Sequence, residues 1–300
     1  MKLLVTGAWQ HTRAQTARLT AMGHTVIELP DERGELPCPP EEIEGIIGNG
    51  LFLHHPIETF TSLRYVQLTS AGYDRMDMDY AKAHGMTVRN AGGVYSDPMA
   101  EYALWGVLSV YRDGRYFYER QEERAWQKKR DLRELGGKRV TVVGCGSVGT
   151  ACATRFTAMG CRVTGIDLVP REDPAYEAMY PVEALREGLP HTDILILTLP
   201  LTPATYHLID RDALNALPRG AVIVNISRGG VVDTEALTAA LRERELSAVL
   251  DVFEQEPLPP RHPLWTLPNA IVTPHNSFVG EGNGKRLEAL ILRNLQAYTP

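Results

Sequence analysis

The residues best suited to chemistry are Arg228, Glu256 and His275, each of which follows an apolar, strand-like segment in the second half of the chain. An arginine can bind a carboxylate and polarise a carbonyl group, and a histidine can exchange a proton near neutral pH. A carboxylate next to a histidine orients it and raises its pKa. Any one of these residues alone is usually structural or solvated, but together they favour hydride transfer to or from the carbonyl of a keto acid.

A glycine-rich turn follows the strand predicted at residues 138–143. Its sequence, GCGSVG at 144–149, places three glycines where a dinucleotide-binding turn needs them: for the tight turn, for close approach to a pyrophosphate and for helix packing. The helix that opens there would offer its N–H groups to the phosphates. We expect cofactor contacts from Gly144, Gly146, Ser147, Val148 and Gly149. A plain strand–turn–helix connection is the weaker alternative.

Asp167 ends the next predicted strand, where a carboxylate would accept hydrogen bonds from the adenosine ribose. Because an acid there repels a 2′-phosphate, we expect NAD rather than NADP, although Arg171 is close enough in sequence to weaken that preference. A second glycine signal at 5–8 lacks further glycines at the right offsets and predicts an ordinary turn.

Composition disfavours several classes of protein. The 300 residues are enough for two cores, and the net charge of −6 comes without a basic run that would favour nucleic acid. We expect no membrane partner, since no segment approaches the roughly 20 apolar residues that span a bilayer. The four cysteines form no metal-binding spacing, so we expect no metal and a reduced, cytoplasmic setting.

Strand and helix patterns alternate along the whole chain, which predicts an α/β fold with parallel sheets. In the second half, strands are predicted at 138–143, 161–166, 194–199, 221–226, 248–252 and 271–273. Helices are predicted at about 203–217 and 234–243, and a long helix at about 98–123 separates the two halves of the chain.

With these features, the chain resembles the D-isomer-specific 2-hydroxyacid dehydrogenases over essentially its whole length. Several long motifs in the right order make this resemblance much more specific than the glycine turn alone. They are 144–149 with Asp167, LPLTPAT at 199–205, NISRGG at 225–230, LDVFEQEPLP at 250–259, TPH at 273–275, SAGYD at 70–74, and NAGGV at 90–94 followed by Ala100-Glu101.

The resemblance implies two Rossmann-like or flavodoxin-like parallel-sheet domains with the active site in the cleft between them. Residues 1–96 plus 279–300 would form the substrate domain, and residues 97–278 the NAD-binding Rossmann domain. The family resemblance also implies a homodimer, with residues 98–118 in the interface.

The resemblance further implies the role of each site residue. Arg228 would bind the substrate carboxylate and carbonyl oxygen, His275 would be the general acid or base, and Glu256 would pair with His275. Further cofactor contacts would come from Pro200, Thr205, Ile226, Ser227 and Asp251. Substrate contacts would come from Arg228, His275 and the backbone around Asn49, Gly50, Ala71 and Gly72.

Departures from the family pattern bear on the substrate. The segment GNGLF at 48–52 lacks the Arg-Ser pair of many phosphoglycerate dehydrogenases, and residues 276–278 replace the commoner small-residue continuation after His275. We therefore expect a small 2-keto acid such as glyoxylate or hydroxypyruvate. The alternatives are D-3-phosphoglycerate dehydrogenase activity and a non-catalytic, NAD-sensing protein like a co-repressor. Formate oxidation is disfavoured, because we would expect Gln where Glu256 stands.

Overall fold

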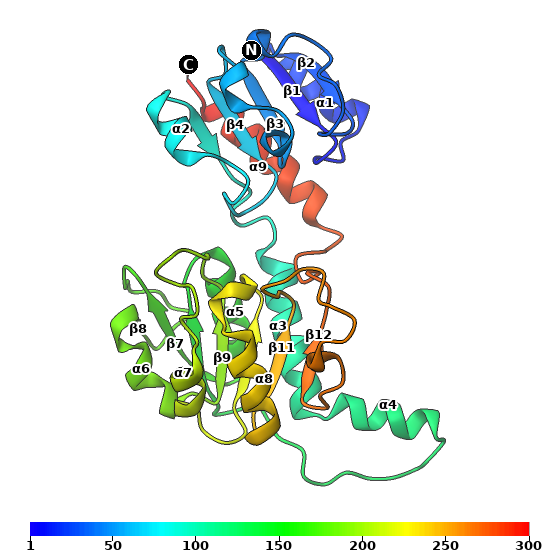
Figure 1. Cartoon of the computed structure of the whole chain (residues 1–300), viewed down its shortest axis with the longest axis vertical. Helices are drawn as coiled ribbons and strands as arrows, with labels where there is room; N and C mark the ends of the chain where they lie inside the picture. The colour runs from blue at the N-terminus through cyan, green and yellow to red at the C-terminus, as the bar shows by residue number, and fades with distance from the viewer. Residues whose placement is uncertain (300) are drawn as a thin grey trace. The chain divides into compact units, whose positions relative to one another are not determined.

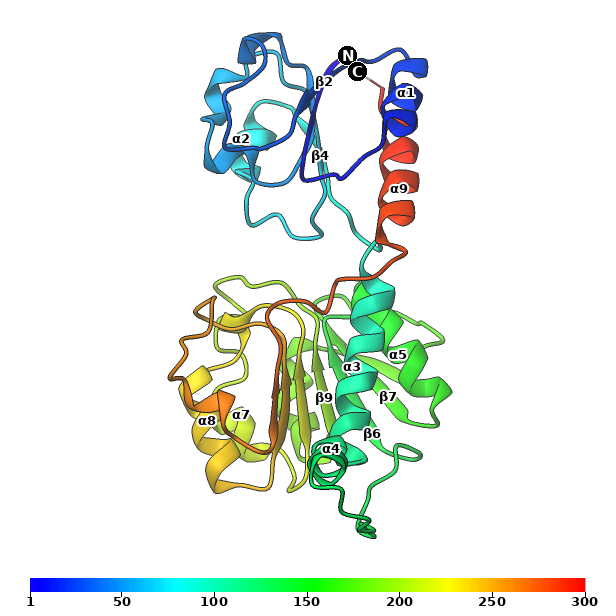
Figure 2. The ribbon, with the colours of Figure 1, turned by 90° about the vertical axis from the view of Figure 1, so that its right-hand side faces the viewer.

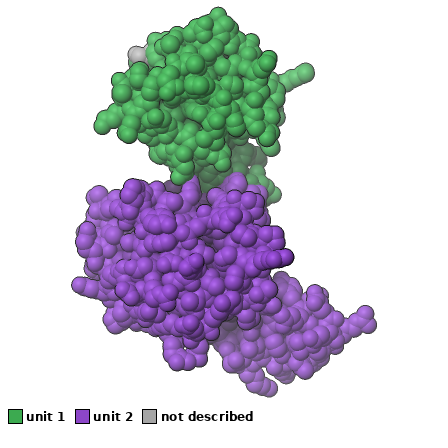
Figure 3. All heavy atoms as spheres, in the orientation of Figure 1, with its two compact units in different colours: residues 1–95, 280–300 green, residues 96–279 purple. Residues whose placement is uncertain are grey.

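Short runs of apolar and β-branched residues alternate with helices along the chain, and every strand pairing within the described residues, 1–299, is parallel. The computed structural model divides into two compact units, residues 1–95 with 280–300 and residues 96–279 (Figure 3). The predicted fold class, two parallel-sheet α/β units, is confirmed.

Unit 1 is a five-stranded sheet in the order β2-β1-β3-β4-β5, the order of flavodoxin-like folds. Its strands are β1 (Lys2–Thr6), β2 (Thr25–Leu29), β3 (Gly45–Gly48), β4 (Tyr65–Leu68) and β5 (Thr87–Arg89). Its helices are α1 (Arg13–Ala21), α2 (Met78–Ala83) and α9 (Asn283–Ala297). The last of these lies beside α1 (Figure 2), where Gln15 donates to Glu288 at 2.8 Å, and thus ties the end of the chain to its beginning.

Unit 2 contains a seven-stranded sheet in the order β12-β11-β10-β9-β6-β7-β8, a Rossmann order with an added edge strand. The strands are β6 (Arg139–Val143), β7 (Arg162–Asp167), β8 (Ala178–Pro181), β9 (Ile194–Leu197), β10 (Val222–Asn225), β11 (Ser247–Leu250) and β12 (Ala270–Val272). The helices are α3 (Ser96–Tyr111), α4 (Gly114–Glu122), α5 (Ser147–Ala158), α6 (Leu185–Gly188), α7 (Arg211–Ala216) and α8 (Thr234–Glu243).

Helices cover both faces of this sheet (Figures 1 and 2). One apolar core joins α3 and α5 to the sheet, and the other joins α7 and α8 to its opposite face. Because both faces are covered, the central strands β9 and β10 are apolar and buried at nearly every position, with Asn225 as the polar exception. This buried sheet fixes the strand ends, and the loops that follow them carry the chemistry.

Two predicted helices differ from the structure. The helix expected at 98–123 is broken after Tyr111, because Asp113 adopts a left-handed conformation (φ 48°) and caps a new helix by accepting the N–H of Tyr116. The helix expected at 203–217 shortens to α7. Its first half is instead a hydroxyl-stabilised turn that ends at His207, which is also left-handed (φ 50°).

Candidate active site

The glycine turn lies at the carboxyl end of β6, next to the point where the strand order reverses. Gly144 has φ 92°, and a Cβ on it would lie 2.7 Å from the backbone nitrogen of Leu199. A Cβ on Gly149 would lie 2.1 Å from the carbonyl oxygen of Gly144, so helix α5 can pack here only without a side chain. Gly146, by contrast, faces open space and leaves α5 without a side-chain cap. This exposed helix N-terminus fits a pyrophosphate.

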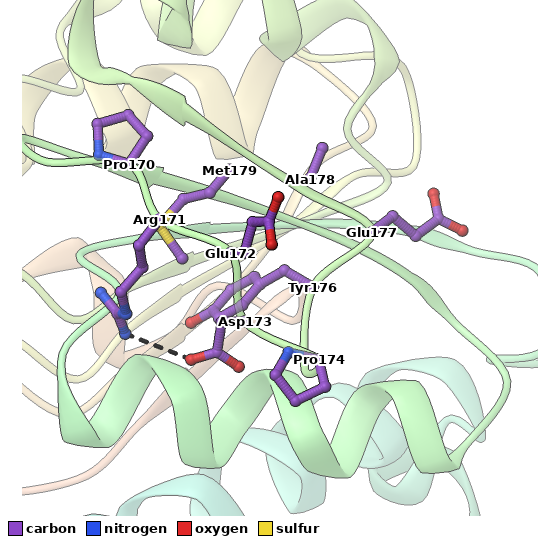
Figure 4. A pocket seen from close by; sticks show the side chains of 9 residues that line it. All are labelled: Pro170, Arg171, Glu172, Asp173, Pro174, Tyr176, Glu177, Ala178 and Met179. Atoms are coloured by element: carbon purple, nitrogen blue, oxygen red, sulfur yellow. Dashed lines mark hydrogen bonds and ion pairs between the residues drawn. The ribbon is translucent and has the colours of Figure 1, made fainter.

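Asp167 and Arg171 both bind the middle of the turn. The Asp167 carboxylate accepts the N–H of Cys145 at 2.6 Å, and the Arg171 guanidinium donates to the carbonyl oxygen of Cys145, also at 2.6 Å. Beyond β7, residues 170–174 and 176–179 line a hollow of about 850 Å³ (Figure 4). The side chain of Arg171 points toward Asp173 there, at 3.5 Å. The negative charge of Asp167 and the positive charge of Arg171 thus lie together beside the position expected for the ribose.

The loop after β9 is held by hydroxyl groups. Thr198 donates to the carbonyl oxygen of Gly144 at 2.6 Å, which ties this loop to the glycine turn. Thr205 donates to the carbonyl oxygen of Pro200 and accepts the N–H of Thr202, both at 2.7 Å. Pro200 is exposed in this turn, so it is available to a ligand, whereas the hydroxyl of Thr205 serves the turn itself.

A buried asparagine positions Arg228. Asn225 accepts the hydroxyl of Ser227 at 2.8 Å and donates to the carbonyl oxygen of Arg228 at 3.1 Å. Ile226 and Ser227, which were expected to contact the cofactor, are 1% and 5% exposed. They support this loop from the protein interior and do not line an open surface. A Cβ on Gly229 would lie 1.8 Å from the backbone of Phe253. The loops after β10 and β11 can therefore lie in contact only because residue 229 has no side chain. Sequence reasoning missed this role of Asn225.

His275 and Glu256 form a pair. Nδ1 of His275 lies 2.8 Å from Oε2 of Glu256, and Oε1 of the same carboxylate accepts the N–H of Phe253 at 3.0 Å. The two side chains are 41% and 38% exposed, so a ligand can reach them. Since the carboxylate holds a proton on Nδ1, the other ring nitrogen, Nε2, is the one that can exchange a proton with a bound molecule.

Asp251 differs from its expected role, because it is 0% exposed and cannot contact a cofactor directly. Its carboxylate accepts the hydroxyl of Thr273 at 2.6 Å and the N–H groups of Asn276 and Ser277 at 2.7 and 2.8 Å. Its carbonyl oxygen accepts the N–H of His275 at 2.8 Å. These bonds hold His275 in a left-handed conformation (φ 52°), which a non-glycine residue adopts at a cost. Asp251 therefore positions residues 273–277, the loop that carries His275 and is called the histidine loop below.

All three residues expected to carry the chemistry line one hollow of about 430 Å³. It is lined by Arg228, Glu256 and His275 with Leu201, Tyr206, Gly229, Gly230, Phe253 and Glu254. Glu254 lies 2.7 Å from Nε2 of His207 and also accepts the N–H of Thr234 at 3.0 Å. Burial alone would raise the pKa of Glu254, but these hydrogen bonds outweigh it and lower the pKa. This second acid–histidine pair adds an anion to the hollow, and sequence reasoning missed it.

In unit 1, the backbone around Asn49 and Gly50 was expected to contact the substrate, but its N–H groups already have partners within the chain. Both groups donate to the Glu32 carboxylate, each at 2.7 Å. The loop after β4 is different, because Ala71 is exposed and its carbonyl oxygen accepts Asn90 at 2.6 Å. The hydroxyl of Ser70 donates to the carbonyl oxygen of Gly72 at 2.9 Å. Of the four residues expected to contact the substrate here, Ala71 is the exposed one, Asn49 and Gly72 are half-buried and Gly50 is buried.

Neither a metal site nor a membrane span is present in residues 1–299. No three His, Cys, Asp or Glu side chains gather there as metal ligands do. None of the helices there has the length and apolarity to cross a bilayer. The four cysteines, Cys38, Cys145, Cys152 and Cys161, are free thiols.

Comparison with known proteins agrees with this geometry. Residues 104–277 match the model of the D-isomer specific 2-hydroxyacid dehydrogenase, NAD binding domain. A glyoxylate reductase from Korarchaeum cryptofilum is 35% identical over 247 residues, which cover 80% of this chain and 74% of that protein.

Solved structures of the same family are similar throughout. A D-isomer specific 2-hydroxyacid dehydrogenase family protein from Aeromonas salmonicida has a TM-score of 0.84 at 27% identity, covering 98% of this chain and 94% of its own. A D-isomer specific 2-hydroxyacid dehydrogenase from Xanthobacter autotrophicus, solved with NADPH and MES, has a TM-score of 0.80 at 31% identity, covering 100% and 96%. The match of residues 104–277 to an NAD-binding domain supports the expected nicotinamide cofactor. This chain belongs to the D-isomer specific 2-hydroxyacid dehydrogenase family.

Proposed function

We propose that this protein interconverts a small 2-keto acid, glyoxylate or hydroxypyruvate, and the corresponding D-2-hydroxy acid. The observation that carries the proposal is the His275–Glu256 pair, which lines one hollow together with Arg228. A relative named glyoxylate reductase, 35% identical over most of the chain, supports the substrate class.

Each of the three residues has a defined task in this reaction. Arg228 binds the substrate carboxylate and polarises the carbonyl oxygen, where negative charge develops. In the reduction, Nε2 of His275 gives its proton to that oxygen as the carbonyl carbon receives a hydride, and in the oxidation it takes the proton back. The Glu256 carboxylate orients the ring through Nδ1 and stabilises the imidazolium.

The nicotinamide cofactor supplies or accepts the hydride when it is bound. Its pyrophosphate would lie against Gly144, Gly146, Ser147, Val148 and Gly149, at the uncapped start of α5. Asp167 would accept a ribose hydroxyl, and Pro200 and Thr205 would border the cofactor site. We favour NAD over NADP because the Asp167 carboxylate lies against the glycine turn, where it would repel a 2′-phosphate, and because Arg171, although exposed, is bonded to the carbonyl oxygen of Cys145.

We assign substrate contacts in unit 1 to the backbone of Ala71, which is exposed, and of Gly72, which is half-buried, and cofactor binding to unit 2. We further propose a homodimer, because the segment that follows α3 exposes large aromatic side chains. Phe117, Tyr118 and Trp126 are 41%, 71% and 98% exposed. Large apolar side chains exposed together on one segment often mark a protein–protein contact. The four free thiols favour a cytoplasmic setting.

The test is a panel of 2-keto acids assayed with NADH and with NADPH. We expect turnover of glyoxylate or hydroxypyruvate to the D-product, with a higher kcat/KM for NADH. Tight NADH binding without turnover of any keto acid would refute the enzymatic proposal and favour a cofactor-sensing role. Light scattering on the same sample tests the dimer, which a monomer at micromolar concentration would contradict.

A further inference from the structure

A tyrosine on helix α3 is bonded to the histidine loop. The hydroxyl of Tyr102 lies 2.6 Å from Oγ1 of Thr273, 171 residues further along the chain. The hydroxyl of Thr273 in turn donates to Oδ1 of Asp251 at 2.6 Å. Since a threonine hydroxyl has one hydrogen to give, Thr273 accepts the bond from Tyr102. The hydrogen bonds therefore run in one direction, from Tyr102 through Thr273 to the carboxylate of Asp251.

The surroundings of Tyr102 agree with its role as the donor. Burial raises the pKa of Tyr102 well above its usual value, although the hydrogen bond to Thr273 opposes this effect. The nearby Asp251 carboxylate adds to the rise in pKa. The phenol thus keeps its proton at neutral pH. Aligned hydrogen bonds in a buried region polarise one another, so the bond from Tyr102 strengthens the bond from Thr273 to Asp251.

Helix α3 lies close enough to the sheet for this contact because residue 106 is a glycine. A Cβ on Gly106 would lie 2.4 Å from Cγ1 of Val249 in β11. Tyr102 is four residues earlier in the helix and so lies on the same face. Asp251 directly follows the end of β11, two residues after Val249. The close packing at Gly106 therefore brings Tyr102 to the end of the sheet at which the histidine loop begins.

The bonds continue from Asp251 to three backbone N–H groups in a row. Its carbonyl oxygen accepts the N–H of His275 at 2.8 Å, and its carboxylate accepts those of Asn276 and Ser277 at 2.7 and 2.8 Å. His275 has a φ of 52°, a conformation that a non-glycine residue keeps only where its surroundings hold it. Asp251 and its partners are therefore what fixes the backbone of the histidine.

We propose that Tyr102 is a positioning residue for the proton transfer. Its hydroxyl fixes the Asp251 carboxylate through Thr273, and Asp251 holds His275 in the conformation that the reaction requires. This proposal rests on the proposed function, in which Nε2 of His275 exchanges a proton with the substrate oxygen. Tyr102 itself takes no part in the chemistry, so its loss should slow the proton transfer and leave binding unchanged.

The experiment compares wild type with Tyr102→Phe and a matched control, Tyr111→Phe. The control removes a hydroxyl from the other end of the same helix, where the ring centroid lies 4.2 Å from Cζ of Arg133. In Tyr102→Phe we expect kcat for glyoxylate or hydroxypyruvate to fall at least about threefold, with KM and NADH affinity within about 1.5-fold of wild type. Tyr111→Phe should keep the wild-type kcat. A smaller fall, an effect confined to KM or an equal fall in the control overturns the proposal.

Amide hydrogen exchange tests the same contacts without turnover. Exchange at Asn276 and Ser277, followed by mass spectrometry of the peptide that contains them, should be at least about threefold faster in Tyr102→Phe than in wild type, and unchanged in Tyr111→Phe. Unchanged exchange in Tyr102→Phe overturns the proposal, whatever the activity. If wild type turns over no keto acid, faster exchange still supports the link from Tyr102 to the histidine loop, and only the proposed function fails.

A second pair of variants decides if Tyr102→Phe does not fold. Thr273→Ser keeps the hydroxyl that links Tyr102 to Asp251, whereas Thr273→Val replaces it with a methyl group of similar shape. We expect the kcat of Thr273→Ser to be at least about three times that of Thr273→Val. Equal kcat values in the two variants would contradict the proposal.

Discussion

Nδ1 of His275 lies 2.8 Å from Oε2 of Glu256, so the carboxylate fixes both the orientation and the protonated nitrogen of the ring. A Glu256→Gln variant keeps the shape but loses the charge that stabilises an imidazolium. We expect kcat to fall about 100-fold with a small change in KM, since the lost interaction is strongest in the transition state. Gln255→Ala, at an exposed neighbouring position, should keep the wild-type kcat. A Glu256→Gln enzyme with near wild-type kcat would show that the pair is structural.

Asp251 provides a test of how the histidine loop is held. In Asp251→Asn, the new amide group would face an N–H donor of Asn276 or Ser277 inside a fully buried site. We expect the free energy of unfolding to fall by about 2–4 kcal/mol, measured by urea denaturation, with a lower kcat. Asn276→Ala keeps the backbone N–H that Asp251 accepts and should change stability by less than about 0.5 kcal/mol. Equal stability of Asp251→Asn and wild type would contradict this role.

The ion pair between Arg139 and Asp193 predicts a pH dependence of stability. Burial by itself would raise the pKa of Asp193, but the hydrogen bonds from the side chain and backbone N–H of Arg139 outweigh it and lower the pKa. A lowered pKa means that the carboxylate stabilises the fold above its unfolded pKa of about 3.9, and that this stability is lost as pH falls through the folded value.

We therefore expect Asp193→Asn to lose about 1 kcal/mol at pH 7, a small value because the Arg139 side chain is 42% exposed. The difference from wild type should shrink as pH falls below about 4. Denaturation at several pH values measures it, with Glu122→Gln as an exposed control. A difference that persists at low pH would point to packing instead of charge.

Cys145 lies inside the glycine turn but should be chemically inert. Its thiol is fully buried, and burial raises its pKa to about 11. Iodoacetamide at pH 8 should therefore leave Cys145 unmodified in the native protein and should not reduce NADH binding, because the thiolate is the reactive form. The same treatment in urea should label it. Mass spectrometry of tryptic peptides measures both, and labelling in the native state would contradict the burial.

Much of this architecture could be predicted from the sequence, because the signals were local. The strand–glycine turn–helix unit at 138–158, the position of Asp167 and the helix at 234–243 all follow from periodicity and turn chemistry. The break at Asp113 was missed, because a left-handed aspartate inside an otherwise continuous helical pattern leaves no clear periodic signal.

Long-range partners could not be predicted in the same way. The carboxylate of Glu32 binds N–H groups 17 and 18 residues further along the chain, and Asp251 binds loop residues 25 and 26 positions away. Neither pairing follows a helical or strand period. Both arise because parallel strands bring distant loops to one edge of the sheet.

The central claim is that His275 exchanges the proton with the substrate oxygen, and a His275→Ala variant tests it most directly. We expect kcat for glyoxylate or hydroxypyruvate to fall by at least about 1,000-fold, while NADH binding, followed by fluorescence titration, stays within about twofold of wild type. His191→Ala, at an exposed histidine, controls for the loss of an imidazole as such. A His275→Ala enzyme that binds NADH and retains more than about a tenth of the wild-type kcat would contradict the account.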